Sequence, residues 1–209
     1  MSTNLLNFKK IFSLNGYKIS EKTLLNKYTK YSYFKHNVKD NNLVFVSPKT
    51  WRDPFEQLYY TATNYKEKYN YIKPTLYCMC LTENSSQNED AAWSLYQNGT
   101  TEKIIKITFN AFEMLTQIDD FCIKNGYSVY IGTIDYSLAA NDISSLSKAS
   151  TPKRGINKNH DIFFPNPFLD EHYFKLLLLK RKAFEFEHEV RFFLIKDDKS
   201  NYCNEDYFP

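Results

Sequence analysis

The segment 184–195, near the end of the sequence, constrains the fold more than any other part of the chain. It reads F-E-F-E-H-E-V-R-F-F-L-I, so apolar and charged side chains alternate before the run becomes apolar throughout. Because the side chains of a β-strand point alternately to its two faces, this pattern predicts a strand with two unlike faces. We expect the core-facing side to hold Phe186, His188, Val190, Phe192 and Leu194, and the charged side to hold Glu185, Glu187, Glu189 and Arg191.

The charged side of this strand has two interpretations. Glu187, Glu189 and Arg191 follow one another at a spacing of about 7 Å, the rise of two strand residues, and such a row can bind a hydroxyl-bearing or cationic substrate. Alternatively, the row is the solvated face of an antiparallel strand whose carboxylates flank an arginine. Composition by itself favours the solvated face.

The other patterns mix helices and strands without strict alternation, which predicts an α+β fold. We expect a single domain over residues 21–209, with a mixed, mostly antiparallel sheet and flanking helices. An N-terminal amphipathic helix or arm over 1–20 would precede it and offer a surface for a protein partner. A polar stretch predicts a surface excursion at 141–168. The expected strands are 42–48, 75–81, 103–109 and 127–136; the expected helices are 1–14, 90–97, 110–126 and 170–182; a turn is expected at 51–56.

Composition removes several classes of protein. Aromatic residues make up 17% of the chain, enough large rings to bury a sizeable core, which excludes general disorder. The sequence contains neither G-x-x-x-x-G-K-[ST] nor G-x-G-x-x-G, which excludes P-loop and Rossmann phosphate binding. Apolar runs such as 176–179 are too short to cross a bilayer, and the first residues lack the order of a signal peptide. We therefore expect a cytoplasmic protein without a membrane partner.

The spacing of cysteine and histidine predicts no metal site. Cys78-x-Cys80 has no second pair at a zinc-binding distance, so we expect it, Cys122 and Cys203 to be reduced thiols. The four histidines do not form H-E-x-x-H. The formal charge of +3 is too small to identify a nucleic-acid partner, although basic residues gather around 148–158 and 175–182.

Four groups of residues, spread over most of the chain, resemble the successive motifs of a known family. They are Lys27-Tyr28-x-x-Tyr31; Asn42-Leu43 with Ser47-Pro48-x-x-x-x-Asp53-Pro54-Phe55-Glu56; Cys80 with Trp93-Ser94-x-Tyr96; and Lys180-x-x-x-Phe184-x-Phe186-Glu187-x-Glu189-x-Arg191. In order and spacing they resemble the bacterial family catalogued as domain of unknown function 2971. The second and fourth groups are the most specific, because they combine rare residue types at fixed separations. The chain departs from the family pattern at Arg52, Leu95 and Phe184.

A further similarity points to a reaction. An aromatic residue on an early strand, a middle segment with Ser and Tyr, and a glutamate on a late strand are similar to the plan of ADP-ribosyltransferases, whose substrate is NAD. The likeness implies an ADP-ribosyltransferase-like fold and an enzyme that cleaves the nicotinamide ribosyl bond of NAD. Its acceptor would be a macromolecule, protein or nucleic acid, and its role that of a bacterial toxin or phage-defence effector.

The similarity also assigns roles to residues. Glu189 would stabilise the positive charge that develops on the ribose, and Glu187 would orient or deprotonate the acceptor. Arg191 would steer the pyrophosphate or neutralise the two glutamates. The residues expected to contact NAD are Tyr28, Tyr31, Ser47, Asp53, Trp93, Tyr96 and Arg191.

Other interpretations stay open. The rings can serve only to pack the core, Asp53 can close a turn, and Ser47 can end its strand. A metal-dependent nuclease would gather Asp53, Glu187 and Glu189 around magnesium, although Arg191 stands where the usual lysine would be. A non-catalytic interaction module would need no active site.

Overall fold

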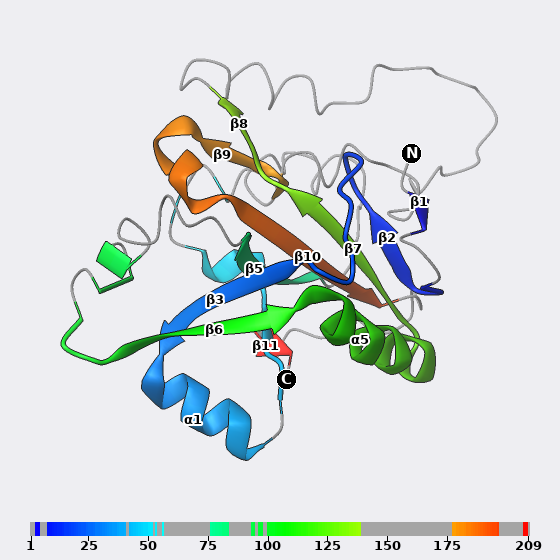
Figure 1. Ribbon diagram of the computed structural model, residues 1–209, viewed down its shortest axis with the longest axis horizontal. Coiled ribbons are helices and arrows are strands. Elements are labelled where there is room, and N and C mark those ends of the chain that lie inside the picture. The colour runs from blue at the N-terminus through cyan, green and yellow to red at the C-terminus, as the bar shows by residue number, and fades with distance from the viewer. Residues whose placement is uncertain are drawn as a thin grey trace, which may run out of the picture.

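The computed structural model of the chain describes residues 3–4, 8–40, 42–51, 53, 56, 76–83, 93–94, 96–97, 100–138, 177–196 and 207–208 (Figure 1). The excursion predicted at 141–168 lies outside these residues. In chain order the elements are β1 (Thr3–Asn4), β2 (Ile11–Ser13), β3 (Leu24–Lys30), α1 (Tyr31–Lys39), β4 (Phe45–Val46), the 3-10 helix η1 (Pro48–Thr50), β5 (Leu76–Glu83), β6 (Ile104–Asn110), α5 (Ala111–Asn125), β7 (Tyr127–Thr133), β8 (Asp135–Leu138), β9 (Leu179–Arg181), the 3-10 helix η2 (Lys182–Glu187), β10 (Glu189–Lys196) and β11 (Tyr207–Phe208).

A mixed, mostly antiparallel sheet forms the body of the described structure, which confirms the predicted α+β class. Its main path runs β1-β2-β7-β10-β5-β3-β6, and β4, paired with β11, joins β5 beside that path. β10 is antiparallel to both of its neighbours, β5 and β7, whereas β2 runs parallel to β7. β8 and β9 form a second, two-stranded parallel sheet.

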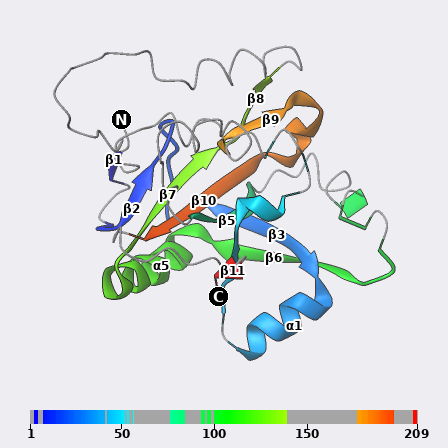
Figure 2. The same cartoon turned by 180° about the vertical axis from the view of Figure 1, so that it is seen from behind.

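β10 is the central strand, and both of its faces are buried. Val190, Phe192 and Leu194 belong to the main core, which includes the buried side of α5 (Figure 2). Phe193 and Ile195 point to the other face and enter a second apolar cluster. A strand covered on both sides requires an almost continuous apolar run, which is why 192–195 contains no polar residue.

The predicted strand 184–195 is wrong in its first part. β10 begins at Glu189, η2 precedes it, and His188 between them has a left-handed backbone with φ of +41°. The alternating letters of 184–188 suit a strand, but both neighbouring strands stop here, with Glu189 pairing with Thr82 and Val190 with Thr133. As a result His188 is exposed, where the prediction placed it against the core.

The helix predicted at 110–126 is confirmed as α5. The Asn110 side chain accepts a hydrogen bond of 3.1 Å from the backbone amide of Glu113, which caps the first turn. Gly126 ends the helix in the left-handed region, with φ of +70°. Leu115, Ile118 and Cys122 are buried on the face toward the sheet.

The helix predicted at 1–14 is wrong, because Ile11–Ser13 form β2 and pair with β7 within the main sheet. Apolar residues at helical spacing also suit a short chain segment that buries Phe8, Ile11 and Leu14 in turn. The Asp119 carboxylate of α5 accepts hydrogen bonds from the backbone amides that enter β2, at residues 9 and 10. This segment is therefore part of the domain, where the prediction made it a separate helix or arm.

Other boundaries differ from their predictions. The end of the helix expected at 170–182 is wrong, since Leu179–Arg181 form β9. The strand expected at 42–48 is confirmed only at Phe45–Val46, because Ser47 already caps η1. The strand expected at 127–136 divides at Ile134 into β7 and β8.

The remaining predictions agree with the described residues. β5 and β6 confirm the strands expected at 75–81 and 103–109. Residues 93–94 and 96–97 are helical, as expected for 90–97, and Glu56 N donates to Asp53 O in the turn expected at 51–56. Among the described helices, none has both the length and the apolar character that crossing a bilayer requires.

Candidate functional site

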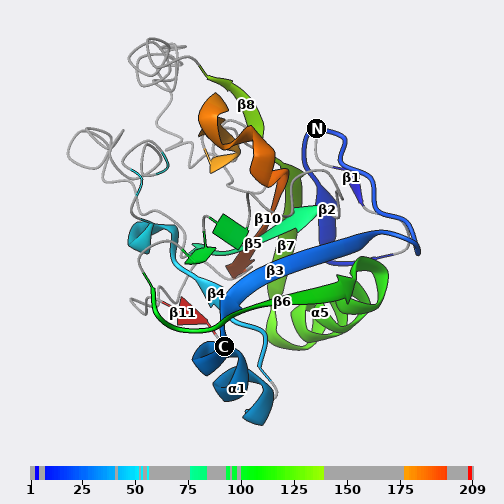
Figure 3. The ribbon, with the colours of Figure 1, turned by 60° about the vertical axis from the view of Figure 1, so that its left-hand side comes forward.

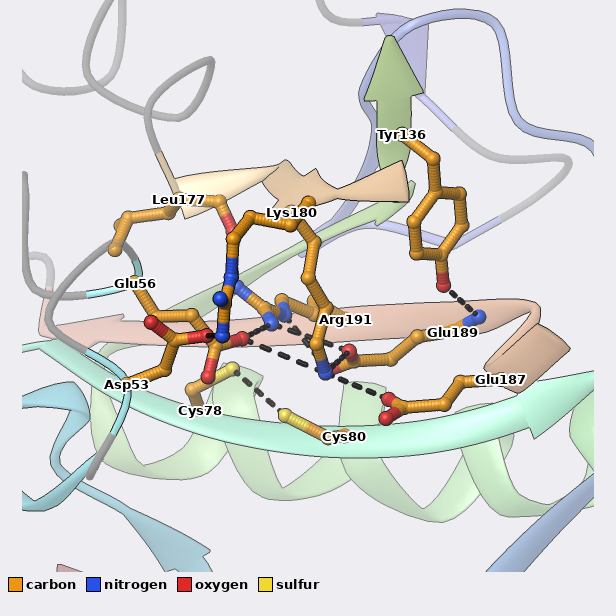
Figure 4. A network of polar contacts seen from close by, with 11 residues as sticks. Asp53, Glu56, Cys78, Cys80, Tyr136, Leu177, Lys180, Glu187, Glu189 and Arg191 are labelled. Atoms are coloured by element: carbon orange, nitrogen blue, oxygen red, sulfur yellow. Dashed lines mark hydrogen bonds and ion pairs between the residues drawn. The ribbon is translucent and has the colours of Figure 1, made fainter. Parts of the chain in front are cut away.

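Five charged side chains meet on the face of the sheet that is opposite α5 (Figure 4). We call them the ionic cluster: Glu56, Lys180, Glu187, Glu189 and Arg191. Glu187, Glu189 and Arg191 are only 7%, 5% and 1% exposed. The solvated-face interpretation of this row is therefore wrong. Charges buried to this degree require partners of opposite sign.

β10 brings the first pair together, because residues two apart on a strand share a face. Arg191 Nε donates to Glu189 Oε1 over 2.7 Å, and Arg191 Nη2 donates to Glu189 Oε2 over 3.1 Å. Arg191 lies opposite Cys80 in the ladder with β5, and the Cys80 thiol lies 3.9 Å from the thiol of Cys78. Both carboxylate oxygens of Glu189 are thus occupied.

Lys180 reaches the same acids from β9, outside the main sheet. Its Nζ donates to Glu187 Oε2 over 2.6 Å and to Glu189 Oε2 over 2.9 Å, and lies 3.6 Å from Glu56 Oε1. The neighbouring strand β8 contributes Tyr136, whose hydroxyl accepts a hydrogen bond of 2.9 Å from the backbone amide of Glu189. The small sheet therefore supplies both a cation and a hydroxyl to the cluster.

The Arg191 side chain contacts groups from several elements of the fold. Besides Glu189, its guanidinium donates to Glu56 and, over 2.6 Å, to the backbone carbonyl of Leu177. Its central carbon lies 4.2 Å from the ring centroid of Trp51, close enough for a cation–π contact. Of the two roles predicted for Arg191, the structure contains the neutralising one.

The cluster holds three carboxylates and two cations, which leaves one negative charge in excess when all are ionised. Burial works against the charge of Glu189, but Arg191 and Lys180 outweigh it and lower the pKa of Glu189 to about 2. Burial raises the pKa of Glu187, and Lys180 offsets this only in part while Glu189 and Glu56 add to it. Two neighbouring acids with pKa values displaced in opposite directions are typical of sites that exchange protons.

Three rings lie beside the ionic cluster, and we call them the aromatic cluster: Tyr28, Trp93 and Tyr96. Tyr28 stacks on Tyr96 with centroids 5.2 Å apart and meets Trp93 edge-on at 5.1 Å. Asn26, Thr82 and Glu189 are direct partners in neighbouring ladders, so Tyr28, two residues after Asn26, lies on the same face of the sheet as Glu189. Rings from the first half of the chain and acids from its end thus come together.

The other predicted contact residues lie elsewhere or have structural partners. Tyr31 is 49% exposed on α1, where it contacts Phe34. Ser47 is buried, and its hydroxyl accepts from the backbone amide of Lys49 at the start of η1. Asp53 accepts a hydrogen bond of 2.8 Å from Arg181. Contact with NAD stays a prediction for these residues.

The site analysis of the sequence missed Lys180, Glu56, Trp51 and Tyr136. Lys180 and Glu56 stand at positions of the motifs that carry the family resemblance, so a signal for them existed. Their roles were not evident because Glu56 and Arg191 are 135 residues apart in the chain. No such signal marks Trp51 or Tyr136.

The arrangement does not favour the nuclease interpretation. Each of its three proposed ligands is engaged with a cation: Asp53 with Arg181, Glu187 with Lys180, and Glu189 with Arg191. Within the described ranges, no three His, Cys, Asp or Glu side chains are placed to hold a metal ion. Magnesium would have to displace the ammonium and guanidinium groups that now separate these carboxylates.

The motif residues Tyr28, Trp93, Tyr96, Glu56, Lys180, Glu187, Glu189 and Arg191 all contribute to the two clusters. The resemblance to the domain of unknown function 2971 family stays a prediction from those motifs. Comparison of the chain with protein-family models, with curated proteins and with solved structures finds no match.

Proposed function

We propose that the chain is an ADP-ribosyltransferase-like enzyme that cleaves the nicotinamide ribosyl bond of NAD at the two clusters. The observation that carries the proposal is that Tyr28 of the aromatic cluster shares one face of the sheet with Glu189 and stacks there on Tyr96. Flat aromatic faces suit the nicotinamide and adenine rings, and carboxylates suit a ribose that becomes positively charged. The family resemblance and the macromolecular acceptor belong to the same proposal.

The reaction breaks the bond between the nicotinamide ring nitrogen and C1′ of the ribose. The electron pair of that bond stays on the nitrogen, which leaves neutral nicotinamide and an oxocarbenium-like ribose. An acceptor hydroxyl or amine, or water, forms the new bond to C1′ as the old bond breaks and gives up its proton in the same step. Glu187, whose pKa is raised by burial, is the carboxylate suited to take that proton.

In this proposal Glu187 keeps the role that the sequence-based hypothesis gives it, whereas Glu189 no longer contacts the ribose. Arg191 binds both oxygens of the Glu189 carboxylate and Lys180 binds one of them, so we make Glu189 the residue that positions Lys180. Glu187 accepts a hydrogen bond from Lys180 at one oxygen, Oε2. Glu187 is therefore the acid assigned to contact the substrate.

Release of labelled nicotinamide from NAD tests the proposal without knowledge of the acceptor, because water can replace it. We expect Glu187→Gln to slow release about 100-fold or more, the usual contribution of a proton-transferring side chain. Glu185→Gln is the matched control, because Glu185 is exposed and two residues away. Thermal unfolding of both variants checks that they fold. Absence of release by the wild-type chain, or equal rates in the two variants, would refute the proposal.

A further inference from the structure

We propose that α1 and the adjoining face of β3 and β6 bind single-stranded nucleic acid. This inference goes beyond ribosyl transfer and does not rest on it. Its starting point is that α1 contains no buried residue, although it carries two tyrosines, a phenylalanine and a valine. Figure 3 shows this helix at the border of the molecule, beyond the end of β3.

The exposed apolar area of α1 is large for so short a helix. Tyr31, Tyr33 and Val38 are 49%, 61% and 60% exposed. A nine-residue helix is marginal by itself in water, and burial does not stabilise this one. Instead, neighbouring groups hold its start: Tyr31 N donates to Lys103 O over 2.8 Å, and Ser32 N to Glu102 Oε1 over 3.1 Å. The structure thus keeps an uncovered aromatic helix in place.

Rings and positive charges share one side of the helix. Tyr31, Phe34, Lys35 and Val38 stand at i, i+3, i+4 and i+7, and Lys39 follows Lys35 by one turn. α1 contains no acidic residue, and among the described residues neither Lys35 nor Lys39 forms an ion pair. An aromatic stripe bordered by lysines is suited to bases that stack and to phosphates that carry the negative charge.

The same chemistry continues on the sheet toward the aromatic cluster. Lys30 and Tyr28 share a face of β3, and Lys106 of the edge strand β6 is the direct cross-strand partner of Tyr28. Lys30 also lies 5.7 Å from the ring centroid of Tyr33, which links the sheet to the helix. Lysines and rings therefore adjoin on the two strands as they do on α1, while Tyr33 stands on the side of the helix away from the stripe of Tyr31 and Phe34.

These observations favour a polyanion with flat bases over other occupants. A membrane surface would require a broader apolar face than two rings and one valine on nine residues provide. An acidic protein would satisfy the lysines but would leave the series of ring faces unexplained. The net charge of +3 did not indicate this partner, because acidic residues elsewhere in the chain cancel the local excess of lysine.

Fluorescence anisotropy of the full chain with labelled oligo-dT and oligo-U of about twelve nucleotides tests the proposal. We expect dissociation constants between about 10⁻⁴ and 10⁻⁶ M that weaken from about 50 to about 200 mM salt. Tyr31→Ala should weaken binding about 5- to 100-fold through lost stacking. Lys35→Gln with Lys39→Gln should reduce the salt slope by about 1.4, the value for two phosphate contacts on a single strand. The two oligomers distinguish RNA from DNA.

Lys22→Gln with Lys124→Gln is the matched control, since it removes the same charge from two exposed sites away from α1. The proposal is overturned if neither oligomer binds at low salt, or if the control lowers affinity as much as the α1 variants do. It is also overturned if the chain sediments with anionic vesicles and binds no oligomer. Because no measurement involves NAD, failure here leaves the proposed reaction to its own test.

Discussion

The ammonium nitrogen of Lys180 lies 2.6 Å from Oε2 of Glu187, seven residues further along the chain. This short pair spans the turn between β9 and β10, which η2 forms. It therefore ties β9 to the end of η2, and the second hydrogen bond of Lys180, to Glu189, holds β9 against the central strand of the large sheet. Changes at either residue should affect both the stability of the chain and the position of the acid.

Lys180→Met should destabilise the fold by about 3–5 kcal/mol, because removal of one partner leaves buried carboxylates without compensation. Lys182→Met is the control, since Lys182 is exposed and only two residues away. Lys182→Met should change the free energy of unfolding by no more than about 0.5 kcal/mol. Urea unfolding measures the free energy of unfolding of both variants, and an equal decrease in the two would contradict the role given to Lys180.

Arg191→Lys should cost about 2–4 kcal/mol although the charge is conserved. A lysine cannot form two parallel hydrogen bonds with Glu189, and it lacks the flat group that lies over Trp51. Arg181→Lys is the comparison, because the Arg181 side chain is 39% exposed and pairs with Asp53. We expect that variant to lose less than about 1 kcal/mol in urea; a loss as large as that of Arg191→Lys would count against the geometric argument.

The free energy of unfolding should depend on pH through both Glu187 and Glu189, and the two dependences should have opposite signs. Burial notwithstanding, Arg191 and Lys180 hold the pKa of Glu189 at about 2, below its usual 4.5. Its contribution, roughly 3 kcal/mol, is complete above the unfolded value and is lost as pH falls toward 2. Burial raises the pKa of Glu187, so its ionisation removes stability as pH rises above 4.5.

Glu187→Gln isolates the second effect. The variant should gain stability relative to wild type as pH increases from about 4 to about 8, because only the wild type has to ionise this group. Denaturation at a series of pH values provides the measurement, and Glu185→Gln should show no such trend. A constant difference between wild type and Glu187→Gln would mean that the Glu187 carboxyl ionises as easily in the fold as in water.

Gly132→Ala should destabilise the chain by about 1–3 kcal/mol through steric overlap. An added Cβ would lie 2.9 Å from Leu178 Cδ1 and 3.0 Å from Leu14 Cβ. Because Leu178 precedes β9, we also expect the overlap to displace Lys180 and to slow nicotinamide release. Ser137→Ala, at an exposed position of β8, should unfold at the wild-type temperature.

Much of the fold was predictable where short-range rules decide the structure. Asn110, the periodic apolar residues after it and Gly126 specify α5 locally, and the apolar runs at β5 and β6 suit only buried strands. The start of β10 was not predictable, because it depends on where β5 and β7 stop pairing. The structure of the first residues was not predictable for a similar reason. Their apolar spacing suits a helix, and residues 11–13 form β2 because they pair with β7 in the folded chain.

Three members of the ionic cluster, Glu187, Glu189 and Arg191, were predictable from the sequence, but their environment was not. The spacing of Glu187, Glu189 and Arg191 indicates a charged row, yet whether water or protein covers that row depends on other segments. Lys180 covers the two glutamates and compensates their charge, and Glu56 does the same for Arg191. Lys180 lies outside the alternating pattern of the strand, and Glu56 is far from the row in the sequence. Only the resemblance of motifs placed them in the same set.

The position of β10 has a consequence for how the protein forms. Before residues 189–196 leave the ribosome, the strands already made fall into two groups, β1 and β2 with β7 and β3 with β4, β5 and β6, and among the described residues no strand pairing joins the two groups. The last long strand must then insert between two waiting edges and form ladders on both sides. Synthesis at about 5–20 residues per second leaves those edges open for several seconds, a period in which a chaperone or a neighbouring nascent chain has access to them.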